Sequence, residues 1–183
     1  MTPYAIVYTS RTGNTAKLAE LAGQILPKQD CAFLGQPESN GCSDVPLILA
    51  GFWTDRGSCT PEMQEFLKSL HGKTIALFGT AGFGGDSAYF SQILSRVSSL
   101  IPADNRILPG FLCQGKMLPA VRKRYEAQLE QHPGDAQMLQ MIANFDAAST
   151  HPDKADLEKF RQWVESIQQM IDGNSNRAES PLV

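Results

Sequence analysis

A short loop near the start of the chain has the residue types of an anion site. It runs from Thr9 to Thr15, between an apolar β-branched segment and a helical pattern. A loop that joins a strand to a helix start points backbone N–H groups and the positive end of the helix dipole outward. Gly13 allows a tight turn. After Thr9, the polar or charged side chains in the loop are those of Ser10, Arg11, Thr12, Asn14 and Thr15. We therefore predict that this loop binds an anion.

The spacing in this loop favours a phosphate monoester over other nucleotide groups. The loop lacks the Gly-x-Gly-x-x-Gly arrangement of dinucleotide sites, and it also lacks the Gly-Lys-Ser/Thr ending of nucleotide-hydrolysing phosphate loops. The alternative is a hydroxyl-rich turn that only caps a helix, because Ser, Thr and Asn are common capping residues.

Further polar and glycine-bearing segments follow later apolar runs. Their candidate site residues are Trp53, Thr54, Asp55, Arg56, Gly57, Thr80, Ala81, Gly82, Phe83, Gly84, Asp86, Cys113 and Gln114. Trp53 either stacks on the ring of a bound ligand or is a core residue. The glycines after Thr80 either let a ligand approach the backbone or form an ordinary flexible turn. Cys113 is expected to be a small buried hydrophobe.

The elements that position these loops alternate between strands and helices. Strands are predicted at residues 4–9, 31–34, 47–53, 74–79 and 106–113. Apolar residues at helical spacing predict a helix that follows the loop and ends before Pro27, and one that begins at Pro61, with Thr60 as its N-cap, and includes Leu70. Two further helices are predicted over the apolar positions from 90 to 101 and at about 153–171. Pro109 indicates a bend or an edge position in the last strand. This alternation predicts an α/β fold with a five-stranded parallel sheet between two helical layers.

Two segments do not fit this alternation. Residues 116–151 contain two amphipathic patterns and are predicted to be a helical insertion before the last helix. Residues 173–183 are polar and without periodicity, so a disordered tail is expected there. The length of 183 residues then suits a single domain over residues 1–172.

The loop Tyr8 to Thr15, placed directly after the first strand, resembles the phosphate-binding signature of the flavodoxin family. The resemblance implies the strand order 2-1-3-4-5 and a bound flavin mononucleotide (FMN). It places the FMN phosphate in the loop at residues 10–15. The flavin ring is then expected between the loops at residues 53–57 and 80–86, with Phe83 as a flanking aromatic and Gln114 near the rim.

The resemblance also implies a redox-linked movement and shows two departures. The peptide Arg56–Gly57 matches the position of a peptide that flips toward the flavin when the ring takes up an electron and a proton. Trp53 lies two positions before the aromatic that often stacks on the ring in the family. Arg11 replaces a neutral donor, so we expect it to pair with phosphate or to face a partner.

Bulk properties exclude several classes of function. The chain has 16 Lys and Arg residues against 19 Asp and Glu residues, so no broad basic field for nucleic acid or anionic membranes is expected. No apolar run reaches membrane-spanning length, and a soluble cytoplasmic protein is expected. Four cysteines at irregular spacing and three scattered histidines indicate neither a metal site nor a dithiol motif.

These observations lead to one main hypothesis and two alternatives. The main hypothesis is an FMN-dependent electron carrier whose partners are a reductase and an electron-accepting enzyme. The first alternative is an NAD(P)H-dependent quinone or flavin reductase that uses the insertion to shape a substrate pocket. The second is a flavin-free interaction module on the same fold, because a fold does not determine function. A phosphoacceptor receiver is disfavoured because no acidic pair follows Tyr8.

Overall fold

The computed structural model describes residues 2–37, 42, 44–84 and 87–178, with side chains described as far as Gly173. Its centre is a five-stranded parallel sheet in the order β2-β1-β3-β4-β5. The strands are β1 (Tyr4–Tyr8), β2 (Cys31–Gly35), β3 (Leu47–Trp53), β4 (Thr74–Ala81) and β5 (Arg106–Gln114). Both the predicted fold class and the predicted strand order are confirmed.

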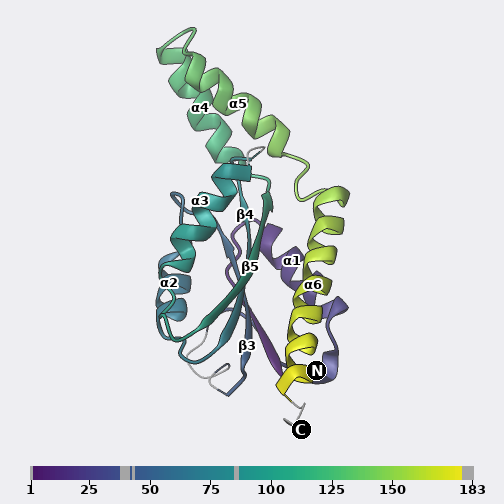
Figure 1. Cartoon of the computed structure of the whole chain (residues 1–183). Helices are drawn as coiled ribbons and strands as arrows, with labels where there is room; N and C mark the ends of the chain where they lie inside the picture. The colour runs from purple at the N-terminus through teal and green to yellow at the C-terminus, as the bar shows by residue number, and fades with distance from the viewer. Residues whose placement is uncertain (1, 38–41, 43, 85–86, 179–183) are drawn as a thin grey trace.

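Helices cover the sheet on both faces, as Figure 1 shows. They are α1 (Asn14–Ile25), α2 (Pro61–Lys68), α3 (Ser87–Ser98) and α6 (Lys154–Ala178), with a short 3-10 helix η1 (Lys28–Asp30) before β2. Helices α2 and α3 lie on one side of the sheet, and α1 and α6 lie on the other (Figure 1).

The alternation of side chains along each central strand divides the core into two layers. In β1, Ala5 and Val7 pack with residues of α2 and α3, whereas Tyr4 and Ile6 pack with residues of α1 and α6. Successive strand residues point to opposite faces, so a strand that is apolar throughout must be covered on both sides. This double burial holds the carboxyl ends of β1, β3 and β4 in place. We call the side of the sheet where these strands end its carboxyl edge.

Strand β5 forms one edge of the sheet, in agreement with the proline in its sequence. Pro109 lies within the strand, and the pairing with β4 shifts register between Ala76 and Phe78. Proline cannot donate a hydrogen bond to a neighbouring strand, so it is tolerated at an edge or a bulge. Of the two predicted alternatives, a bend or an edge position, the edge position is confirmed.

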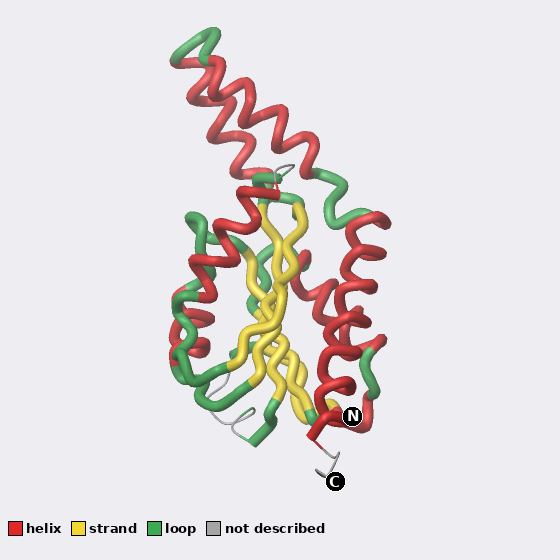
Figure 2. The backbone as a smooth tube through the Cα atoms, viewed as in Figure 1, coloured by secondary structure: helices red, strands yellow, loops and turns green. Residues whose placement is uncertain are grey.

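The predicted insertion is an antiparallel helical hairpin. It consists of α4 (Pro119–Gln131) and α5 (Ala136–Ala148), which follow β5 and precede α6. Figure 2 shows the two helices extending away from the carboxyl edge of the sheet. Ala148 is the only residue of the two helices that is fully buried. The hairpin therefore adds almost nothing to the core and lies beside the candidate site.

The last helix is longer than its sequence pattern indicated. A tail was expected from Gly173 onward, but α6 continues to Ala178, so the expected start of the tail was placed too early. An interior glycine costs a helix only about 1 kcal/mol relative to alanine, which is too little to end it.

Residues 179–183 lie outside the described part of the chain. Among the described residues, no helix is both long and apolar enough to cross a membrane.

Candidate functional site

The loop after β1 caps the start of α1 only in part. Gly13 is the N-cap residue, with φ of 83°, and it has no side chain that could cap the helix. The Ser10 hydroxyl accepts a hydrogen bond from the Ala16 backbone N–H over 3.2 Å, so it satisfies one of the first N–H groups. A helix start in which a glycine stands at the N-cap is suited to bind an anion with its other N–H groups.

Two of the predicted donors in this loop are engaged within the protein. Asn14 donates its side-chain amide to the Lys116 carbonyl over 2.9 Å, and the Thr15 hydroxyl lies 3.1 Å from the Thr80 hydroxyl. Both residues are buried. Their side chains thus connect the loop to β4 and to the residues after β5, whereas Thr12 remains only half-buried.

Two buried hydroxyls at the same edge have no partner. Among the described residues, the Oγ1 atoms of Thr9, Thr54 and Thr60 are inaccessible to solvent and make no hydrogen bond, and the first two of these residues directly follow neighbouring strands. Thr9 follows β1 and Thr54 follows β3, and these strands are neighbours in the sheet. A buried hydroxyl without a partner costs about 1–3 kcal/mol. A polar ligand at the carboxyl ends of β1 and β3 would supply the missing partners, and this arrangement fits the expected cofactor.

Trp53 and Arg11 join the two loops at this edge. The Arg11 guanidinium lies 5.4 Å from the centre of the Trp53 ring, at cation–π distance. Trp53 is half-buried, and Arg11 is exposed. Arg11 therefore packs on the Trp53 ring at the end of β3. Trp53 is not one of the buried core residues.

A tight turn follows β3. Asp55 and Ser58 exchange two backbone hydrogen bonds, of 2.8 and 2.9 Å, around Arg56 and Gly57. Both central residues have positive φ, 48° for Arg56 and 78° for Gly57, as in a type I′ turn. Arg96 of α3 donates to the Gly57 carbonyl over 2.8 Å. The turn is thereby held on one side and is presented at the same edge as Thr54.

The loop after β4 lies against the base of the hairpin. The Gly82 carbonyl accepts hydrogen bonds from Gln114 over 3.3 Å and from Asn144 over 3.1 Å. Phe83 is partly exposed and meets Tyr89 edge-on, with the ring centres 6.2 Å apart. Ala81 is buried, and Gly84 packs against the Gln114 side chain. The predicted site residue Asp86 lies outside the described residues.

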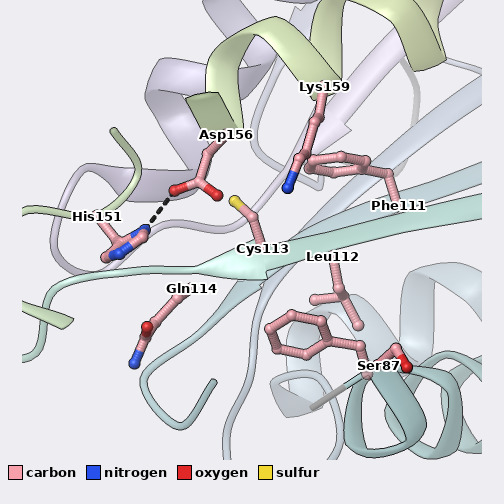
Figure 3. Close-up of a pocket in the computed structure, with 9 residues that line it drawn as sticks. Ser87, Phe111, Leu112, Cys113, Gln114, His151, Asp156 and Lys159 are labelled. Carbon is pink, nitrogen blue, oxygen red and sulfur yellow. Dashed lines mark hydrogen bonds and ion pairs between the residues drawn. The ribbon is translucent and has the colours of Figure 1, made fainter. Parts of the chain in front are cut away.

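A groove of about 470 Å³ lies along the outer side of β5 (Figure 3). Its apolar lining includes Phe90, Phe111 and Leu112, and its polar lining includes His151, Asp156 and Lys159. Strands β3 and β4 separate β5 from β1, so the groove is distant in the sheet from the anion loop. Sequence reasoning did not single out His151, Asp156 or Lys159, because they come from the segment beyond the hairpin.

Cys113 is buried beside this groove. Figure 3 shows its sulfur directed toward Asp156. Burial, together with the carboxylates of Asp156 and Asp153, raises the pKa of the Cys113 thiol. A thiol that stays protonated is a poor nucleophile. Cys113 is therefore a packing residue, whereas its neighbour Gln114 reaches the loop after β4.

Three residues of metal-ligating type meet at the start of α6. One potential ligand atom from each of His151, Asp153 and Asp156 lies within 4.8 Å of the others. Asp153 and Asp156 accept hydrogen bonds from each other's backbone N–H over 2.9 and 3.0 Å, and His151 pairs with Asp156. This reciprocal pattern is a capping box, so the cluster is explained by the helix start.

Comparison with known proteins matches this architecture to one family. The flavodoxin domain model matches residues 5–165. A flavodoxin-like domain-containing protein, BilS, from Clostridium symbiosum (strain WAL-14163) is 38% identical over 178 residues, which cover 88% of this chain and 93% of the relative. BilS from Clostridioides difficile (strain CD3) is 31% identical over 165 residues, with 88% and 94% covered.

A solved structure supports the same fold. A flavodoxin from the domain Archaea superposes with a TM-score of 0.55 over 93% of this chain and 99% of that chain, at 15% sequence identity. At this identity the likeness concerns the fold alone. It agrees with the strand order and the layers described above.

Proposed function

Because the chain belongs to the flavodoxin domain family, we propose that it binds FMN at the carboxyl edge of its sheet and carries electrons between two proteins. The observation that carries this proposal is the pair of buried, unpartnered hydroxyls of Thr9 and Thr54 beside the start of α1, where the N-cap residue is a glycine. These groups need a polar ligand at the place where the strand order reverses, which is where α/β sheets bind ligands.

The phosphate of FMN would be held mainly by backbone. The N–H groups at the start of α1 and the hydroxyls of Thr9 and Thr12 would donate to it. The side chains of Asn14 and Thr15, which bond to Lys116 and Thr80, would hold the loop in shape. Arg11 is occupied by Trp53 and would contribute positive charge near the phosphate without a direct bond.

The flavin ring would lie between the Asp55–Ser58 turn and the Gly82–Gly84 loop. When bound, FMN supplies the capacity to accept and release electrons one or two at a time. The protein residues would orient the ring and exclude water from one side of it. We further propose that the Arg56–Gly57 peptide reorients with the redox state, since its turn already has two residues at positive φ.

Partner proteins are proposed on the same basis. A reductase would deliver electrons and a second enzyme would accept them, with cytoplasmic exchange between the two.

The hairpin next to the site favours a second candidate, a flavodoxin-like reductase that acts on a small molecule. Oxidation of NAD(P)H by the purified protein alone would favour that candidate, whereas reduction only in the presence of a separate reductase would favour the carrier.

The cofactor assignment is tested by FMN titration of the purified protein and of Thr9→Val and Thr54→Val. Valine keeps the shape of threonine and removes the hydroxyl, so FMN affinity is expected to fall by about 3- to 10-fold for each variant. Riboflavin, which lacks the phosphate, is expected to bind more weakly than FMN to the unaltered protein.

The control is Thr74→Val at the start of β4, at the opposite edge of the sheet, and it should bind FMN unchanged. The proposal is wrong if the unaltered protein binds neither flavin. Equal affinity for FMN and riboflavin would contradict the phosphate site.

A further inference from the structure

The base of the α4–α5 hairpin is hydrogen-bonded to two of the three loops of the candidate cofactor site, those that follow β1 and β4. Lys116 and His151, where the chain enters and leaves the hairpin, are joined by a backbone hydrogen bond of 2.8 Å. On one side the Lys116 carbonyl accepts from Asn14 at the start of α1. On the other side Asn144 of α5 donates to the Gly82 carbonyl. The hairpin thus contacts the phosphate loop and one of the ring loops together.

The contact with Gly82 is closely packed. The Asn144 amide donates to the Gly82 carbonyl over 3.1 Å, and its own oxygen accepts from Gln114 over 3.2 Å. Gln114 also donates to the Gly82 carbonyl. A Cβ added at Gly82 would lie 2.6 Å from Met117. Two amide groups that bond to each other and to one carbonyl leave this peptide little freedom to rotate.

The direction of this carbonyl determines the direction of the next N–H group. In a trans peptide the C=O and the N–H point in opposite directions. The Gly82 carbonyl points toward Gln114 of β5 and Asn144 of α5, so the Phe83 N–H points away from them. Strand β3 and its Asp55–Ser58 turn lie on the other side of β4 from β5. The Phe83 N–H therefore points away from β5, the strand on the other side of β4 from β3, and the flavin ring is proposed to lie beside the turn that follows β3.

We propose that Asn144 is a positioning residue which, through the Gly82 carbonyl, aims the Phe83 N–H at the flavin ring and thereby raises its reduction potential. This inference rests on the proposed function. A fixed N–H dipole stabilises negative charge that develops on a bound group, and it does so more strongly for the reduced ring than for the neutral oxidised ring. The insertion then tunes the redox chemistry of the site, although none of its residues needs to touch the flavin.

The test is Asn144→Ala, with the affinities for oxidised and reduced FMN measured by titration and the midpoint potential measured spectroscopically. Reduced FMN is expected to lose about 3- to 10-fold more affinity than oxidised FMN. For the two-electron couple between oxidised and reduced FMN, this ratio lowers the midpoint potential by about 14–30 mV. Should the alanine variant retain no flavin, Asn144→Ser, which keeps a short donor, is measured instead, and a smaller shift in the same direction is expected.

The matched control is Gln140→Ala, one turn earlier on the exposed surface of α5, and its potential should be unchanged. A merely structural role of Asn144 would weaken both redox states equally and leave the potential in place, and that result would overturn the inference. An Asn144→Ala protein with unaltered affinities and potential would overturn it as well. Failure of the unaltered protein to bind FMN would instead overturn the proposed function.

Discussion

At the scale of single residues, the site depends on groups whose partners are far away in sequence. Asn14 bonds to Lys116, Thr15 to Thr80, and Arg96 to Gly57. Each of these bonds joins a residue of a helix to a strand or loop that is distant in the sequence. The polar residues of the loops therefore divide into those that shape the site and those that remain available to a ligand.

Gly57 gives a prediction at this scale. Its φ of 78° is unfavourable for a residue with a Cβ, and an added Cβ would lie 2.5 Å from the Arg96 guanidinium that bonds to its carbonyl. Gly57→Ala is expected to lower the free energy of unfolding by about 1–2 kcal/mol from the backbone alone, and by more from the lost Arg96 contact. Urea denaturation measures the change.

The control for this prediction is Gly72→Ala. Gly72 also has positive φ, 63°, but an added Cβ there has no neighbour within 4 Å. It should show only the backbone part of the cost. Equal destabilisation by the two variants would mean that the Arg96 contact contributes nothing to stability.

At the scale of elements, helix starts govern much of the local structure. The N-cap residue of α1 is Gly13, which has no capping side chain, whereas the start of α6 carries the reciprocal Asp153–Asp156 capping box. A capping box satisfies the first N–H groups of its helix, so of these two helix starts only that of α1 is a candidate anion site. Pro61 and Pro119, in the first turns of α2 and α4, suit positions where an N–H would have no helical partner.

The capping box predicts a pH dependence of stability. Hydrogen bonding from the Asp156 backbone lowers the pKa of Asp153 below its ordinary value. A carboxyl whose pKa is lower in the folded state stabilises the protein above its unfolded pKa, and this stabilisation is lost as the pH falls through the folded pKa. Between pH 5 and pH 3, the urea midpoint of Asp153→Asn should therefore fall less than that of the unaltered protein. Identical pH profiles for the two proteins would contradict this assignment.

At the scale of the whole molecule, the doubly covered sheet is a rigid support for a site at one edge. Both faces of the central strands are buried, and the hairpin extends from the same edge that carries the candidate site (Figure 1). A ligand that binds only this folded edge must stabilise the whole domain, because the two core layers share the sheet.

This coupling predicts a thermal shift. FMN at about 100 times its dissociation constant should stabilise the folded state by about 2.7 kcal/mol, which raises the Tm of a domain of this size by about 5–10 °C. Circular dichroism in the far ultraviolet follows the transition. Riboflavin at the same concentration should give a smaller shift, and an unchanged Tm with FMN would argue against a site in the folded domain.

The sequence alone determined the fold class and, through a family resemblance, the strand order, and it pointed to the loops of the candidate site. It could do so because a parallel sheet buried on both faces requires continuous apolar strands, and because Gly13 and its neighbouring hydroxyl residues are a local pattern. The edge position of β5 was likewise visible in Pro109. These features depend on residues that are adjacent in the chain or repeat at a fixed period.

Only the tertiary structure decided which polar groups are available at the site. It showed that Asn14 and Thr15 are engaged, that the hydroxyls of Thr9 and Thr54 have no partner, and that Asn144 of the insertion reaches Gly82. Residues 62 positions apart in the chain form that last bond. Hydrogen-bond partners depend on the relative placement of packed elements to within a fraction of an ångström, and no local pattern encodes this placement.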